Sequence, residues 1–203
     1  MLADLRFRAL LSSDDWALLP PATRKRFSKR LAGGDTAVYA GEVVEVAFSR
    51  AGWWLAQIAR LIGGPLPVSA DTRVPSIVTV TEDTATGGQV WTRIYARRNG
   101  FPQVIHSAKR FAGPTGLEEY VGCGVGMALR IVVDDGALEF RSAHYFLQLG
   151  RLKLVLPAWL TPGALTVTHT DRGDGAFQFT LDIVHPRFGR LIRQIAVFRE
   201  ATP

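Results

Sequence analysis

The sequence predicts an α+β fold that is mainly β: a strongly curved antiparallel meander of about ten strands, forming a barrel or half-barrel with helices packed on it. From residue 75 onward, hydrophobic and polar side chains alternate with a period of two, and Gly-Gly, Asn-Gly and Asp-Gly turn signals separate the segments. Before residue 75, the chain contains helix caps and one apolar stretch with helical spacing. So many hairpin-linked strands cannot stay flat and exposed, so we expect the sheet to curl and the helices to cover it.

Composition favours one globular domain over residues 1–203. With 47% hydrophobic and 21% charged residues, the 203-residue chain is long enough to bury a core without disulfides. One cysteine, Cys123, and four histidines exclude a disulfide framework and the usual four-ligand zinc site, and we expect no metal or cofactor. The N-terminus lacks an export signal and no apolar run reaches the roughly 20 residues of a membrane span, so a cytoplasmic location is predicted.

Two short helices are predicted within residues 12–31, because Ser12-Ser13-Asp14-Asp15 offers an N-cap and Pro20-Pro21 separates the two segments. Basic residues are dense here, which suits contact with phosphate or anionic lipid, or a solvated helix face. No aromatic interleaving or nucleic-acid motif accompanies the charges. The solvated face is therefore favoured, and no nucleic-acid partner is expected.

The β-branched and aromatic residues of 36–48 predict the first long strand. Residues 51–64 predict an amphipathic helix that ends at Gly63-Gly64-Pro65. Its core-facing side would carry Trp54, Ile58, Leu61 and Ile62, with Gln57 and Arg60 turned away. Trp53 and Trp54 are interpreted as core residues, with a lipid-interface or lid role as the alternative.

Further strands are expected near 75–83, 88–98, 101–111, 117–134, 137–149, 151–156, 163–171, 175–185 and 189–199. A two-residue turn at Asn99-Gly100 would set Arg93 opposite His106, so that Arg93, Tyr95, His106 and Arg110 share one face, where the first three can grip an anionic group. The alternative is a solvated face with an arginine stacked on an aromatic ring. Across the next loop, Lys109 falls beside Glu119 and Arg110 beside Glu118, giving two opposite-charge pairs on opposite faces.

His144 is a second candidate site residue. Through the Asp135-Gly136 turn it shares the core-like side of the sheet with Met127, Phe140 and Phe146. Burial there favours the neutral imidazole near physiological pH, which suits a proton donor or acceptor. The alternative is a core histidine satisfied by a neighbouring hydroxyl, and a one-residue bulge would reverse the faces.

The order of motifs from Val90 to Phe198 resembles a bacterial family known as domain of unknown function 4166. The resemblance rests on VWTRIYARRNGFPQVIHSAKRFAGPTGLEEYVGCGVGMAL, DDGALEF, LGRLKLVLPAWLTPG and GDGAFQFTLDIVHPRFGRLIRQIAVF, with DDWALLPPATRKRF near the N-terminus. It implies a domain found alone or fused to dehydrogenase-like domains, and hence a dehydrogenase-like partner for this chain. The charged positions that match the family are Arg93 and Glu119.

Three functions follow as hypotheses. The first is a module that binds an apolar or amphipathic small molecule inside the curl, with its polar end near Arg93, Tyr95 and His106 or near His144. The second is an isomerase- or cyclase-type enzyme in which His144 or Glu119 carries the proton. The third is a domain that docks on a dehydrogenase partner. A cavity of several hundred cubic ångströms favours the first two functions, and a filled core favours the third.

Overall fold

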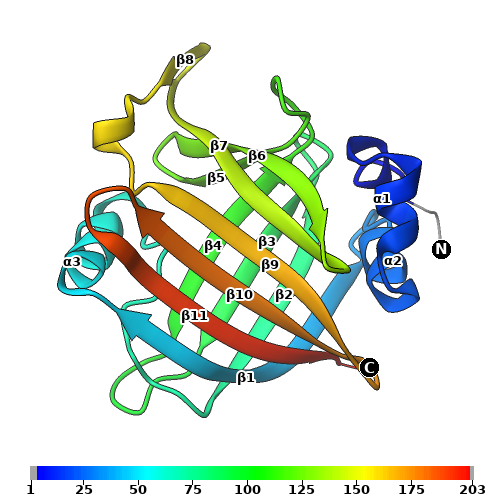
Figure 1. The fold of residues 1–203 in the computed structure, drawn as a ribbon, viewed down its shortest axis with the longest axis horizontal. Coiled ribbons are helices and arrows are strands. Elements are labelled where there is room, and N and C mark those ends of the chain that lie inside the picture. The colour runs from blue at the N-terminus through cyan, green and yellow to red at the C-terminus, as the bar shows by residue number, and fades with distance from the viewer. Residues whose placement is uncertain (1–3, 202–203) are drawn as a thin grey trace.

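The computed structural model describes residues 4–201, whose strands form one antiparallel sheet that closes on itself (Figure 1). The sheet order is β6-β5-β4-β3-β2-β1-β11-β10-β9-β7-β8, and a β6–β7 pairing closes ten strands into a barrel, with β8 outside it. The predicted mainly β fold is confirmed. The strands are β1 (Thr36–Phe48), β2 (Val74–Asp83), β3 (Gly88–Tyr95), β4 (Gln103–Arg110), β5 (Glu118–Gly122), β6 (Val125–Asp134), β7 (Ala137–Leu149), β8 (Leu152–Val155), β9 (Ala164–Gly173), β10 (Ala176–His185) and β11 (Gly189–Glu200).

The predicted strand 117–134 is wrong in one respect, because it is divided into β5 and β6 by a tight turn. Gly122, Cys123 and Gly124 all adopt positive φ, at 138°, 48° and 76°. Three successive residues in this region of backbone space cannot continue a strand. Cys123 is therefore an exposed turn residue and not part of an apolar strand.

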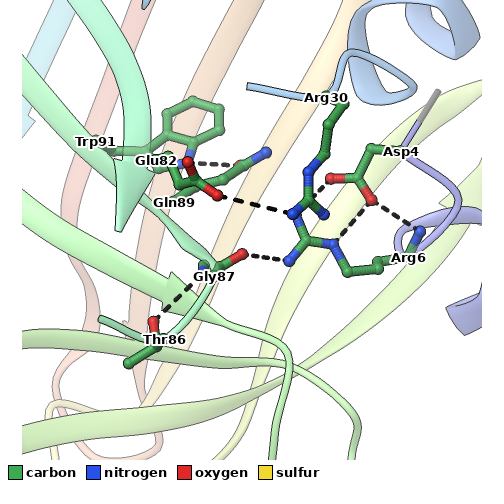
Figure 2. Close-up of polar contacts among 9 residues, drawn as sticks. Asp4, Arg6, Arg30, Glu82, Thr86, Gly87, Gln89 and Trp91 are labelled. Carbon is green, nitrogen blue, oxygen red and sulfur yellow. Dashed lines mark hydrogen bonds and ion pairs between the residues drawn. The ribbon is translucent and has the colours of Figure 1, made fainter. Parts of the chain in front are cut away.

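The N-terminal segment closes one end of the barrel. It contains η1 (Arg8–Leu10) and the two predicted helices, α1 (Ser13–Leu18) and α2 (Pro21–Phe27). The rings of Phe7 and Phe27 lie 6.2 and 5.8 Å from that of Phe140 on β7. Figure 2 shows how this segment is attached: Arg6 pairs with Asp4 and donates to the carbonyl of Gly87 in the β2–β3 turn, and Arg30 lies 3.7 Å from Glu82.

Part of the basic charge of α2 and the residues after it is engaged within the protein. Lys29 pairs with Glu200, and the Arg26 guanidinium lies 4.0 Å from the centre of the Phe177 ring. These contacts use the cations to anchor the N-terminal segment to the barrel. Arg24 and Lys25 of α2 form no ion pair within residues 4–201.

The opposite end of the barrel carries α3 (Arg50–Ile58), which continues into η2 (Ala59–Ile62) (Figure 1). The helix exists as predicted, but half of its predicted core face is turned to the surface. Small residues, Gly52, Ala56 and Ala59, face the barrel and are buried. Trp54 and Leu61, which were predicted to face the core, are 62% and 83% exposed and point outward, and Trp53 is exposed as well. The other two predicted core-facing residues, Ile58 and Ile62, line the interior of the barrel, although Ile58 is 61% exposed at its edge. None of the helices within residues 4–201 has the length and apolar character needed to cross a membrane.

A buried histidine links the N-terminal segment to the barrel wall. His169 on β9 is fully buried, stacks on Phe177 at 4.9 Å and contacts Phe27 and Phe179. Its Nε2 lies 3.0 Å from Arg26 Nη1 and must accept this hydrogen bond, because a guanidinium only donates. Burial and the Arg26 charge both lower the pKa of His169, to about 3.

Acid should therefore destabilise the protein through His169. Because the pKa is about 3 in the folded chain and 6.5 in its ordinary state, the unfolded chain binds the extra proton between these values, and stability falls as the pH drops through this window. Lowering the pH from 7 to 5 should remove about 2 kcal/mol through this group. Urea unfolding at both pH values checks this. His169→Phe should abolish most of the difference, whereas His106→Gln, on the exposed outer face, should retain it; an unchanged difference in His169→Phe would contradict this origin.

Candidate functional site

A cavity of about 350 Å³ occupies the interior of the barrel. Its wall is mainly apolar, with side chains from most strands and from α3. Ile58 and Leu160 line it near the α3 end and are themselves exposed, so the cavity reaches the surface there, and we call this opening the mouth. The wall also contains polar groups. The lining residues with a polar side-chain atom are Trp91, Arg93, Tyr95, Ser107, Lys109, Glu119, Tyr145 and Gln194.

Three charged side chains form a cluster in the wall, which we call the ionic cluster: Arg93, Lys109 and Glu119. They come from the adjacent strands β3, β4 and β5, and Lys109 pairs directly with Glu119 in the sheet, as predicted. Lys109 Nζ lies 2.9 Å from Glu119 Oε2, and Arg93 Nη2 lies 3.6 Å from Glu119 Oε1. Arg93 Nη1 also donates to Ser107 Oγ at 3.1 Å. One carboxylate thus faces two cations.

Burial and mutual attraction set the charge state of the ionic cluster. Burial alone raises the pKa of Glu119, but the charges of Lys109 and Arg93 outweigh it and bring that pKa to about 2. Burial lowers the pKa of Lys109, and Glu119 opposes this shift. Glu119 is therefore ionised at neutral pH. The Arg93 charge also lowers the pKa of Lys109. When Lys109 is protonated, the cluster carries one excess positive charge in a largely apolar cavity.

Tyr145 adds a polar group with no partner. In the sheet, Glu119 pairs with Met127 and Met127 with Tyr145, so the tyrosine lies on the same inner face as the ionic cluster. Its ring is buried, and its hydroxyl has no hydrogen-bond partner within residues 4–201. Burial raises the pKa of Tyr145 to about 12, so the hydroxyl keeps its proton and can donate it in a hydrogen bond.

Of the residues predicted from the register of β3 and β4, Arg93 and Tyr95 line the cavity but His106 does not. His106 pairs with Thr92 and is exposed, and its Nδ1 lies 3.0 Å from Thr92 Oγ1. Tyr95 pairs with Gln103, so the connection spans residues 96–102 instead of the two residues Asn99-Gly100. The predicted register is therefore off by one residue, and the prediction that His106 faces the same side as Arg93 is wrong.

His144 is likewise absent from the cavity wall. His144 pairs with Ala128, but Ser142 pairs with the next residue, Leu129, so Ala143 is an extra residue in β7. This bulge reverses the alternation beyond it. Tyr145 therefore faces the cavity, while His144 is half-buried outside it. The predicted position of His144 in the core is wrong for this reason.

A comparison with protein-family models shows which family the chain belongs to. The model described as "Domain of unknown function (DUF4166)" matches residues 19–198, which includes every barrel strand nearly to the end of β11. The chain belongs to the DUF4166 family. No curated protein and no solved structure matches it. The resemblance found in the sequence is thereby confirmed.

In this DUF4166 chain, the sequence identified Arg93, Tyr95 and the Lys109–Glu119 pair and missed other neutral members of the site. The predicted register placed Arg93 and the Lys109–Glu119 pair on opposite faces, so their proximity was not expected. Ser107 and Tyr145 were not considered as ligands, although the two-residue alternation that places Lys109 inward also places Ser107 inward. Within the described part of the chain, no three His, Cys, Asp or Glu side chains are grouped as metal ligands.

Proposed function

We propose that this DUF4166 domain binds one amphipathic small molecule with an anionic group inside the barrel. The observation that carries the proposal is the ionic cluster, whose two cations and one carboxylate open on an apolar cavity. In a low-dielectric interior an unbalanced charge is unfavourable, so a ligand carboxylate or similar anion would be attracted to this point. The apolar part of the ligand would fill the cavity toward the mouth.

The donors available to such an anion support the proposal. The Arg93 guanidinium has five N–H groups, but it donates to Ser107 and pairs with Glu119 at a distance long for a hydrogen bond. Its side chain is 21% exposed, and because Arg93 lines the cavity, this surface faces a bound ligand. The unpartnered Tyr145 hydroxyl is a further donor. The volume of about 350 Å³ falls in the range of small-molecule sites.

Acid–base catalysis is less well supported by the same geometry. Glu119 was one of two candidate proton carriers, but a carboxyl with a pKa of about 2 is a weak base and holds no proton to donate near neutral pH. The other candidate, His144, is not among the residues that line the cavity. The cavity also weighs against a domain whose role is only to dock on a dehydrogenase partner, because that function requires no internal space.

A matched pair of fluorescent probes tests the binding proposal. Anilinonaphthalene sulfonate and phenylnaphthylamine share an aromatic core, but only the first carries a negative charge. We expect the sulfonate to bind more tightly, and Arg93→Met to weaken it by about tenfold to a hundredfold because a charge-assisted contact is lost. The uncharged probe should bind Arg93→Met within about threefold of wild type.

The control for this experiment is His106→Ala, which alters a polar residue of the neighbouring strand that points away from the cavity. It should leave both affinities unchanged. Equal binding of the two probes to wild type, together with no effect of Arg93→Met on either, would refute a role of the ionic cluster in holding an anion.

A further inference from the structure

Large apolar side chains surround the mouth on the outside of the protein. Trp53 and Trp54 on α3 pack edge to face at 4.9 Å, and both are exposed. Leu61 is 83% exposed, and Trp159 on η3 (Ala158–Leu160), the yellow coil after β8, is 77% exposed (Figure 1). Ile58 and Leu160, which join these two groups, line the cavity and are exposed. This apolar rim has six members: Trp53, Trp54, Ile58, Leu61, Trp159 and Leu160.

Basic side chains predominate near the apolar rim, where Arg190 and Arg193 pair with Asp182 and several other arginines have no acidic partner in the described part of the chain. Residues 46–70, 140–170 and 183–199, which include α3, η3 and the β10–β11 turn, contain no Asp or Glu. The exposed arginines in these segments include Arg50, Arg60, Arg151 and Arg187, none of which has an ion-pair partner within residues 4–201. At the closed end, Arg6 pairs with Asp4 and Arg30 with Glu82, while Arg8 and Arg24 form no ion pair within residues 4–201.

We propose that the apolar rim docks the protein on the surface of a membrane that contains anionic phospholipids. Tryptophan and leucine are suited to the boundary between headgroups and acyl chains, and arginines beside them meet the anionic headgroups. A second copy of this chain is a poorer occupant, because a self-complementary contact would bring arginines against arginines. Charge complementarity therefore selects the lipid surface. The docked protein would turn its mouth to the bilayer.

This orientation also gives the cavity a source of amphiphiles, and that step rests on the proposed function. Because the wall of the cavity is mainly apolar and the cavity reaches the surface at the mouth, an amphiphile in the membrane has a continuous apolar path into the barrel. Docking itself does not depend on the cavity being filled. The two proposals can therefore fail separately.

Cosedimentation with lipid vesicles tests docking. We expect the full chain to bind vesicles of phosphatidylcholine containing about one-third phosphatidylglycerol, to bind pure phosphatidylcholine much more weakly, and to be released by salt. The double variant Trp54→Ser with Leu61→Ser should lose at least about tenfold in vesicle affinity, because the apolar area that enters the interface is removed. Neither residue lines the cavity, so the variant should still bind anilinonaphthalene sulfonate.

Leu18→Ser is the matched control, because Leu18 is 67% exposed on α1, at the opposite end of the barrel. It should bind vesicles as wild type does. Three results would overturn docking: no cosedimentation with either vesicle, equal loss in Leu18→Ser and the double variant, or a concentration-dependent dimer that the double variant abolishes. Retained vesicle binding in a protein that binds neither fluorescent probe would overturn only the proposed function.

Discussion

Glu119→Gln should destabilise the protein by about 3–5 kcal/mol, because it leaves the buried Lys109, with the half-buried Arg93 beside it, without a counter-charge in the barrel. Glu119 is only 6% exposed and lies 2.9 Å from Lys109. Glutamine keeps the shape of the side chain and removes the charge, so the loss reports electrostatics and not packing. Urea unfolding at pH 7 measures it. A loss below about 1 kcal/mol would show that the ionic cluster does not depend on this carboxylate.

Removing both members of the close pair should recover part of this loss. Lys109 Nζ lies 4.9 Å from the Trp91 ring and 5.5 Å from the Phe140 ring, so methionine has apolar neighbours at this position. The double variant Glu119→Gln with Lys109→Met should therefore be more stable than Glu119→Gln alone. As a control, Glu45→Gln breaks the exposed Glu45–Arg193 pair at 3.2 Å and should cost less than about 1 kcal/mol.

Much of the fold was predictable because local patterns and tertiary structure agree in most of the chain. The run 36–48 is strand from end to end, and Pro20-Pro21 separates α1 from α2 as expected. Predictions failed where one extra residue ends a strand or changes which face its side chains occupy. The turn at Gly122-Cys123-Gly124 was hidden because alternating glycines in an apolar segment also fit a curved strand, and the bulge at Ala143 has no Gly or Pro to signal it.

These local events determined which candidate residues face the cavity. The Lys109–Glu119 pair was predicted and is present, but the predicted register placed Arg93 on the opposite face from it. The actual register of β3 and β4, shifted by one residue, brings Arg93 to this pair. His106 follows a connection longer than its Asn-Gly signal suggests, and His144 follows the bulge, so each side chain points away from the cavity. A one-residue change in register moves a side chain to the other face, and composition does not reveal it.

The prediction of which face of α3 is buried was wrong for a different physical reason. The largest apolar stripe was assigned to the core, but the helix contacts the barrel through the smaller stripe of Gly52, Ala56 and Ala59. Small side chains let the helix backbone approach the strand closely, and this contact leaves the tryptophans on the surface. The spacing of these three small residues is the signal in the sequence that identifies the buried face.

Gly52→Ala should therefore be strongly destabilising, by about 3 kcal/mol or more, although alanine is the better helix former by roughly 1 kcal/mol. A Cβ at Gly52 would lie 1.8 Å from the carbonyl oxygen of Leu191 on β11, so α3 must move away from the barrel. Because Leu55 and Ala59 of this helical segment line the cavity, the variant should also lose affinity for both fluorescent probes.

Gly150→Ala is the control: Gly150 has a φ of +60° but no atom within 4 Å of an added Cβ, so only the modest strain of that conformation, about 1 kcal/mol, is expected. Thermal unfolding and probe titration of the two variants compare them directly. If Gly52→Ala were as stable as wild type or more so, helix propensity would outweigh contact, and the close approach of α3 to β11 that turns its tryptophans outward would be refuted.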